Sequence, residues 1–401
     1  KLDEISNLGA ARIRVRSLLA ALNDRRRTVS VRQVVDKHPT KRKEHDLVPK
    51  IKESYTLLAP QLSPIHFQFL EAAFQNAGFH LVIAPLPDKS AINEGLKYIN
   101  NDACYPAILA VGQLLQTIQS GAYDLNHTAI LLAQTGGCCR ATNYVALARK
   151  AFQDAGMPQV PVIAFGRESQ SEVPISWSLL ESLIIGIIYG DLLMRVLYRV
   201  RPYEKQPGSA QALYEKWSTK CRNDMLIHGT HNFKSNIRDI VNAFDSLPIE
   251  DHPKPKVGLV GEILVKYHPT ANNNLVELLE TEGMEVVVPD MLDFFLYCAY
   301  DSKVTRNLLA GALLEQFKGV LFIRAAEFYR RHLRSALAAS QRFSPPFTID
   351  HLAELASRHL SLGNLSGEGW LLTGEMAELI QSGVTNIICM QPFACLPNHI
   401  T

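Results

Sequence analysis

The chain has 401 residues, enough for two or three domains with their own hydrophobic cores. Its net charge of +2 and its 20% of charged residues exclude a strong overall attraction to nucleic acid or to an anionic membrane. Seven cysteines are too few, and odd in number, for a secreted disulfide scaffold, so we expect a reducing, cytoplasmic setting. Residues 1–30 are charged and contain no apolar core segment, so no signal peptide is expected there.

Residues 1–53 are polar and basic and predict a linker or a peripheral arm, with one helix over 9–23. Basic clusters stand at 25–27 and at 41–43. Nucleic-acid binding by these clusters stays open, but no aromatic residues are interleaved with them, so a solvated linker is favoured. Because the chain starts at Lys1 and stops directly after a loop-like motif, we expect that it is a piece of a longer polypeptide.

From residue 54 to residue 172, short apolar runs alternate with amphipathic stretches that end near glycine or proline. The expected strands are 55–59, 80–84, 129–133 and 160–165, and the expected helices are 64–77, 103–120 and 140–155. This alternation predicts βαβ units around a parallel sheet.

Residues 173–253 predict a helical block with helices over 175–200, 208–224 and 232–244. The most apolar window of the chain, 179–197, falls in the first of these helices. Glu181, Asp191 and Arg195 interrupt it within a span too short to cross a bilayer, so it predicts a buried helix.

Residues 254–401 predict a second α/β lobe in which a polar loop, 262–274, follows the first strand. The expected strands are 257–261, 285–288, 319–323 and 385–389, and the expected helices are 275–282, 291–299, 303–317, 325–340, 349–359 and 368–382. The expected fold is thus α/β, with two lobes of parallel sheet joined by the helical block.

Three cysteines stand where α/β proteins build their sites. Cys139 and Cys395 follow apolar runs that predict strands, and Cys104 and Cys139 open helical patterns. Ligands of open α/β sheets bind at this edge, where the strands end. A helix N-terminus lowers the pKa of a thiol, and thiolates are the ligands of iron–sulfur clusters.

The surroundings of these cysteines suit the same chemistry. Gly136 and Gly137 let the backbone come close to a bulky inorganic core before Cys139. Arg140 adds a positive charge that would offset a cluster or bind an anionic ligand group. Cys395 lies between two prolines, in a stretch that is neither helix nor inner strand.

Other interpretations stay open on spacing alone, because no C-x-x-C pair or ferredoxin-type run is present and buried structural cysteine is the default. Cys221, Cys298 and Cys389 are expected to pack in the core. The role of Cys138 stays open, because adjacent cysteines rarely both bind one metal, although Cys138 could help to hold a larger cluster. Zinc held by Cys104, Cys139 and Cys395 together with His399 is a further alternative.

Four motifs resemble those of a known family: NNDACYP at 100–106, QTGGCCR at 134–140, VGEI at 260–263 and QPFACLPN at 391–398. They resemble the large proteins related to 2-hydroxyacyl-CoA dehydratases and their activases. In those proteins, ATP-hydrolysing activase modules are fused to a region like a dehydratase subunit, and this chain is similar to that region from residue 54 onward. The chain departs from the family pattern at Cys138 and Ala394, where glycine is expected.

The resemblance implies flavodoxin- or Rossmann-like lobes around a 4Fe-4S cluster, or a double-cubane form of it. The implied cluster ligands are Cys104, Cys139 and Cys395. The residues expected to line the cofactor are Asn101, Gly136, Gly137, Arg140 and Glu262. Asn272, Asn273 and Asn274 either face the same cleft or cap the next helix, and His399 either assists proton transfer or lies on the surface.

The function implied is an iron–sulfur redox component that receives a low-potential electron from an ATP-dependent activase, in the same polypeptide or separate, and passes it to an acyl-CoA or another small substrate. The alternative is a non-catalytic electron-transfer or regulatory module of a larger fusion protein. A dehydratase- or reductase-type enzyme and a homodimer both stay open. No phosphate-binding glycine loop is present, so nucleotide binding within this chain is not expected.

Overall fold

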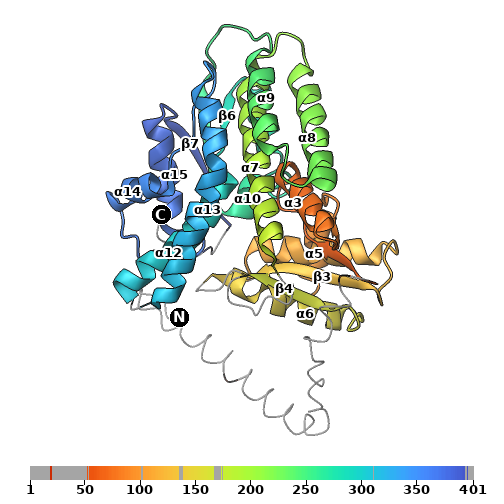
Figure 1. Ribbon diagram of the computed structural model, residues 1–401. Coiled ribbons are helices and arrows are strands. Elements are labelled where there is room, and N and C mark those ends of the chain that lie inside the picture. Colours follow the sequence, from red (N-terminus) through yellow and green to blue (C-terminus); the bar gives the residue numbers. More distant parts are fainter. Residues whose placement is uncertain are drawn as a thin grey trace, which may run out of the picture. The chain divides into compact units, whose positions relative to one another are not determined.

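The computed structural model describes residues 19, 52, 54–100, 103–134, 139–166, 173, 175–309, 311–392 and 395. Contacts within the chain divide it into two units, Lys1–Leu47 and Val48–Thr401. The helix expected over 9–23 lies outside the described residues except for Leu19, which is helical. All strands of the described residues lie in the second unit (Figure 1).

The first lobe contains a sheet of four parallel strands in the order β2-β1-β3-β4. The strands are β1 (Thr56–Ala59), β2 (His80–Ile83), β3 (Thr128–Gln134) and β4 (Val162–Gly166). The helices that connect them are α3 (Pro64–Asn76), α4 (Ser90–Leu96), α5 (Tyr105–Gln119), η2 (Arg140–Asn143) and α6 (Tyr144–Asp154). From β1 the chain crosses to β2 on one side and later returns to β3 on the other, so β1 and β3 flank a topological switch point.

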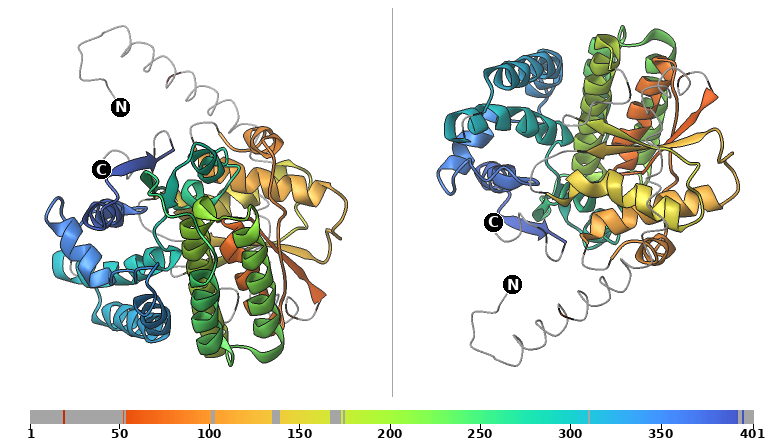
Figure 2. Two further views of the ribbon diagram at one scale, coloured as in Figure 1. Left: turned by 90° about the horizontal axis from the view of Figure 1, so that it is seen from above. Right: turned by 90° about the horizontal axis from the view of Figure 1, so that it is seen from below.

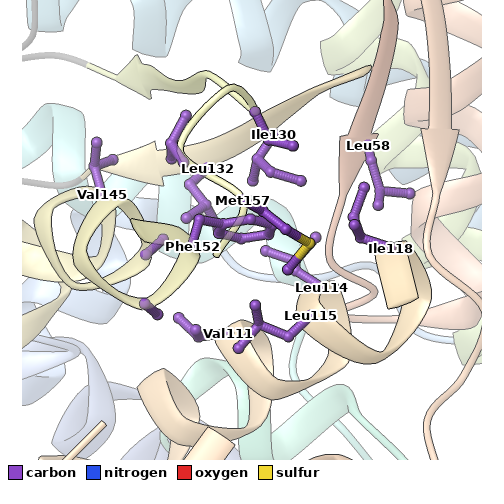
Figure 3. Packing of buried hydrophobic residues seen from close by; sticks show 14 of the residues in the cluster. Leu58, Val111, Leu114, Leu115, Ile118, Ile130, Leu132, Val145, Phe152 and Met157 are labelled. Atoms are coloured by element: carbon purple, nitrogen blue, oxygen red, sulfur yellow. The ribbon is translucent and has the colours of Figure 1, made fainter. Parts of the chain in front are cut away.

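The core of this lobe forms where the sheet meets α5 and α6 (Figure 3). Leu58 and Ile130 are fully buried neighbours on paired strands, and Leu114 and Leu115 of α5 are equally buried. Removing such side chains from water is the main force that holds helix to sheet. The packing fixes the N-terminal ends of α5 and α6 beside the carboxyl ends of the strands.

The helical block consists of α7 (Trp177–Val200), η3 (Arg201–Tyr203), α8 (Ser209–His228) and α9 (Phe233–Asp245). The helix α7 contacts α3, α8, α9, α12 and α13 and is buried along nearly its whole length. The helices α7, α8 and α9 pack against one another, and α7 and α8 also pack against α3 (Figures 1 and 2). The apolar window at 179–197 is therefore a buried helix, as predicted, and no helix in the described ranges has the length and apolarity to cross a membrane.

The second lobe contains a sheet of three parallel strands in the order β6-β5-β7. The strands are β5 (Lys256–Gly261), β6 (Glu285–Val287) and β7 (Asn386–Met390). The helices are α10 (Ile263–Tyr267), α11 (Leu275–Thr281), α12 (Met291–Leu309), α13 (Leu313–Ala338), α14 (Ile349–Ser357) and α15 (Gly369–Gln381). Two parallel sheets with their helices and the helical block confirm the expected α/β fold class.

Buried ion pairs link helices of the second lobe to the helical block. Arg330 of α13 is 1% exposed and donates to Asp293 at 2.6 Å and to Asp290 at 2.8 Å. Asp290 also accepts from Arg195 of α7 at 2.6 Å. A buried guanidinium is tolerated because carboxylates surround it.

The expectation of a strand over 319–323 is wrong. This segment lies inside α13, where Leu321 is 50% exposed. A short apolar run does not distinguish a strand from a helix, and the helical sequence on both sides decides here. Likewise, the loop expected over 262–274 contains α10, whose first N–H groups are capped by the side chain of Glu262.

Candidate functional site

Cys104 directly precedes α5 and caps it with an extended backbone conformation. Its carbonyl oxygen accepts the N–H groups of Ala107 and Ile108, and Pro106 occupies the first turn, where a missing N–H costs nothing. The Sγ atom lies 3.0 Å from the hydroxyl of Tyr144, and the side chain is half-buried. The sulfur therefore stands at the N-terminus of a helix, as the sequence predicted.

Cys139 holds the equivalent position before η2, also with an extended backbone. Burial raises the pKa of its thiol, and the backbone N–H of Ala141 partly offsets this. The charges of Glu368, Cys104 and Glu262 raise the pKa of Cys139 further. Burial and these neighbouring groups thus both disfavour the charged form of the Cys139 thiol.

Tyr144 joins the two cysteine segments. It is the first residue of α6, five residues after Cys139, and its hydroxyl contacts Cys104 from the preceding crossover. Burial raises the pKa of Tyr144 well above its ordinary value, and the charge of Glu262 adds to the shift. The phenol therefore keeps its proton beside the sulfur.

The two carboxyl groups that raise the pKa of Cys139 belong to the second lobe. Glu262 follows β5 and accepts the N–H of Val265 at 2.9 Å, while buried Glu368 accepts the N–H of Ile263 at 2.8 Å. Burial, followed by the charge of Glu368, raises the pKa of Glu262 to about 8. Burial also raises the pKa of Glu368. At neutral pH, carboxyl groups in such a position exchange protons readily.

A buried ion pair stands one helical turn beyond Glu262. Lys266 Nζ lies 2.7 Å and 3.0 Å from the two carboxylate oxygens of Glu375, and both residues are at most 3% exposed. Burial raises the pKa of Glu375 to about 7, against the opposing effect of Lys266. The second lobe therefore contains three glutamates with raised pKa values: Glu262, Glu368 and Glu375.

Cys395 lies at the corresponding edge of the second sheet. It follows β7, whose last residue, Met390, pairs with Gly261 of β5 and accepts the N–H of Glu262 at 3.0 Å. Cys395 is 9% exposed, and its N–H donates to the carbonyl oxygen of Pro392 at 3.1 Å. Cys395 and Glu262 therefore follow neighbouring strands of the second sheet, β7 and β5.

Within the described ranges, no three His, Cys, Asp or Glu side chains stand close enough to share one metal ion. A zinc ion bound by Cys104, Cys139 and Cys395 is therefore not supported by these side chains. An iron–sulfur cluster makes a different demand, because each thiolate binds its own iron and the sulfurs stand further apart than around a single ion.

The remaining predicted residues divide into two groups. Arg140 opens η2 with an exposed side chain, next to Cys139. The others lie outside the described residues: Asn101, Gly136, Gly137, Cys138, Ala394 and His399.

The structure also shows whether the other cysteines pack in the core and whether the asparagines at 272–274 cap the next helix. Cys221 is fully buried, as expected, while Cys389 is exposed, so the prediction that it packs in the core is wrong. The reason is that β7 is an edge strand of the sheet formed by the described strands, and its residues are at best half-buried. Asn274 is the residue before α11 and its side chain makes no cap, whereas the side chain of Asn272 accepts the N–H of Leu275 at 3.2 Å.

Sequence reasoning missed Tyr144, Glu368 and the pair formed by Lys266 and Glu375. No local spacing marks them, because their partners lie 40 or more residues away along the chain. No protein-family model, curated protein or solved structure matches the chain. The family resemblance of the motifs therefore rests on those motifs alone.

Proposed function

We propose that this chain is the iron–sulfur component of a 2-hydroxyacyl-CoA dehydratase-like system. Cys104, Cys139 and Cys395 hold a 4Fe-4S cluster, which receives a low-potential electron from an ATP-dependent activase. The electron passes to an acyl-CoA or another small substrate. The observation that carries the proposal is the contact of Cys104 with Tyr144 at 3.0 Å, which links two half-buried thiols that precede helices: Cys104 before α5, and Cys139 five residues before Tyr144.

The donor chemistry fits such a cluster. Thiolates are its usual protein ligands, and at Cys139 the backbone N–H of Ala141 offsets part of the pKa rise that burial causes. All described cysteines are free thiols, which suits both ligation and the cytoplasmic location that we propose. With three protein ligands, one iron keeps a position open for a substrate atom or a further bridge.

The surrounding residues fit a reaction in which electrons and protons move together. Half-buried Glu262 and buried Glu368 provide carboxyl groups with raised pKa values. Exposed Arg140 offers a guanidinium for an anionic group such as a phosphate of CoA. These residues favour an enzyme component over a module that only transfers electrons.

The proposal is tested by purification and reconstitution without oxygen, followed by iron and acid-labile sulfide analysis. We expect close to four irons and four sulfides per chain and a paramagnetic signal after reduction. A colourless protein without iron would contradict the proposal. Incubation with a separately purified activase, ATP and a 2-hydroxyacyl-CoA then separates the alternatives: substrate turnover supports an enzyme component, and cluster reduction without turnover supports an electron-transfer module.

A further inference from the structure

The contact between Cys104 and Tyr144 connects two segments that are 40 residues apart along the chain. Cys104 begins α5, and Tyr144 begins α6, directly after the turn that starts at Cys139. A single hydroxyl at 3.0 Å from Sγ therefore lies between the helices opened by the two cysteines. Contacts of this kind orient a metal ligand and alter its electron density.

The direction of the hydrogen bond follows from the chemistry of the two groups. A cysteine that binds iron is a thiolate and has no proton to give. A tyrosine hydroxyl is protonated at neutral pH and serves as donor. A bound cluster thus leaves one arrangement, in which the oxygen of Tyr144 donates to the sulfur of Cys104.

We propose that Tyr144 sets the reduction potential of the cluster by donating a hydrogen bond to the sulfur of Cys104. This inference rests on the proposed function and extends it to a residue that no motif marks. The bond draws electron density from the sulfur, and the reduced cluster gains more from it because it carries one more negative charge. Tyr144 is accordingly a positioning residue that acts through Cys104.

The test is a potentiometric titration of reconstituted Tyr144→Phe protein, followed by electron paramagnetic resonance. We expect iron and sulfide content equal to that of the unsubstituted protein. The equilibrium constant for reduction should fall about tenfold, which for a one-electron couple is a potential more negative by about 59 mV. The matched control is Tyr105→Phe, which removes a hydroxyl from the residue next to Cys104 and should leave the potential unchanged.

A second measurement uses the cluster-free, reduced protein and so does not depend on iron binding. The alkylation rate of Cys104 at neutral pH is followed by mass spectrometry, with exposed Cys389 as the internal reference. Tyr144→Phe removes the hydroxyl that lies 3.0 Å from Sγ, so it should change the alkylation rate of Cys104 several-fold and leave that of Cys389 unchanged; an unchanged rate at Cys104 would contradict the contact.

The outcomes separate this inference from the function on which it rests. Full iron content with an unchanged or more positive potential would overturn the role of Tyr144 while leaving the cluster in place. An unsubstituted protein that binds no iron would overturn the function and the tuning role together, and the alkylation rate would still report on the hydrogen bond. A purely structural role for Tyr144 would change the melting temperature without moving the potential.

Discussion

The Nε2 atom of His66 lies 2.9 Å from Oδ1 of Asp191, and both side chains are buried. The same carboxylate accepts the N–H of Met291 at 2.6 Å and that of Leu292 at 3.1 Å. One side chain of α7 therefore binds a helix of the first lobe and caps the N-terminus of α12 in the second. The relative placement of the two sheet edges that carry the cysteines depends on such links.

Replacement of this carboxylate, Asp191→Ala, should lower the free energy of unfolding by about 3 kcal/mol or more, because three buried donors lose their acceptor. Urea denaturation followed by circular dichroism measures the change. Asp239→Asn on the exposed face of α9 is the control and should change stability by less than about 0.5 kcal/mol. Equal stability of the two variants would show that Asp191 does not carry this link.

Gly261 ends β5 with φ of +140°, and an added Cβ there would overlap the backbone oxygen of Met390. Gly261→Ala should cost about 3 kcal/mol, from backbone strain and from the clash with β7. Gly283 also has a positive φ, of +81°, but open space around it, so Gly283→Ala should cost only about 1 kcal/mol. Thermal melts of both variants compare the two contributions. A loss at Gly261 no greater than that at Gly283 would contradict the close approach of β5 and β7.

Stability should depend on pH through Glu262, whose pKa is raised from 4.5 to about 8. The folded protein then holds a proton that the unfolded chain has released, so this contribution is complete below about 4.5 and is lost as the pH rises through about 8. Glu262→Gln should flatten the decline of the unfolding free energy across this window. Exposed Glu282→Gln is the control and should leave the profile unchanged. An unaltered profile in Glu262→Gln would contradict the burial of this carboxyl group.

The buried pair of Lys266 and Glu375 gives a double-substitution test. Lys266→Met alone should cost about 3 kcal/mol, because Glu375 would be left without its partner in the core. The combination of Lys266→Met with Glu375→Leu should recover most of that loss, since two apolar side chains of similar size need no partner. Denaturant unfolding of the single and double variants provides the comparison, and a double variant less stable than the single one would argue against the pair.

Local patterns were sufficient for most of the fold. Strands such as β3 and helices such as α5 follow from apolar runs, from Pro106 near the helix start and from glycine after the helix end. The segment 319–323 was predicted wrongly because its apolar residues fit either a strand or a helix. The sequence also indicated the two sheet edges of the candidate site, the one after β3 with Cys139 and the one after β5 with Glu262.

The interior of the candidate site was not predictable in the same way. The hydroxyl in contact with Cys104 comes from α6, and Glu368, which accepts the N–H of Ile263 next to Glu262, is the residue before α15. These neighbours are brought together by the packing of whole helices, and no spacing along the chain encodes them. The protonation behaviour of the site was not predictable either, because the sequence does not show which glutamates are buried, and burial is what raises their pKa.

The most direct test of the central claim is the iron and acid-labile sulfide content of single cysteine variants after reconstitution without oxygen. Cys104→Ser, Cys139→Ser and Cys395→Ser should each lose most of the iron that the unsubstituted protein binds, while Cys389→Ser, which alters an exposed thiol of β7, should keep it. Full iron content in any one of the first three variants, or equal loss in all four, would contradict a cluster held by Cys104, Cys139 and Cys395.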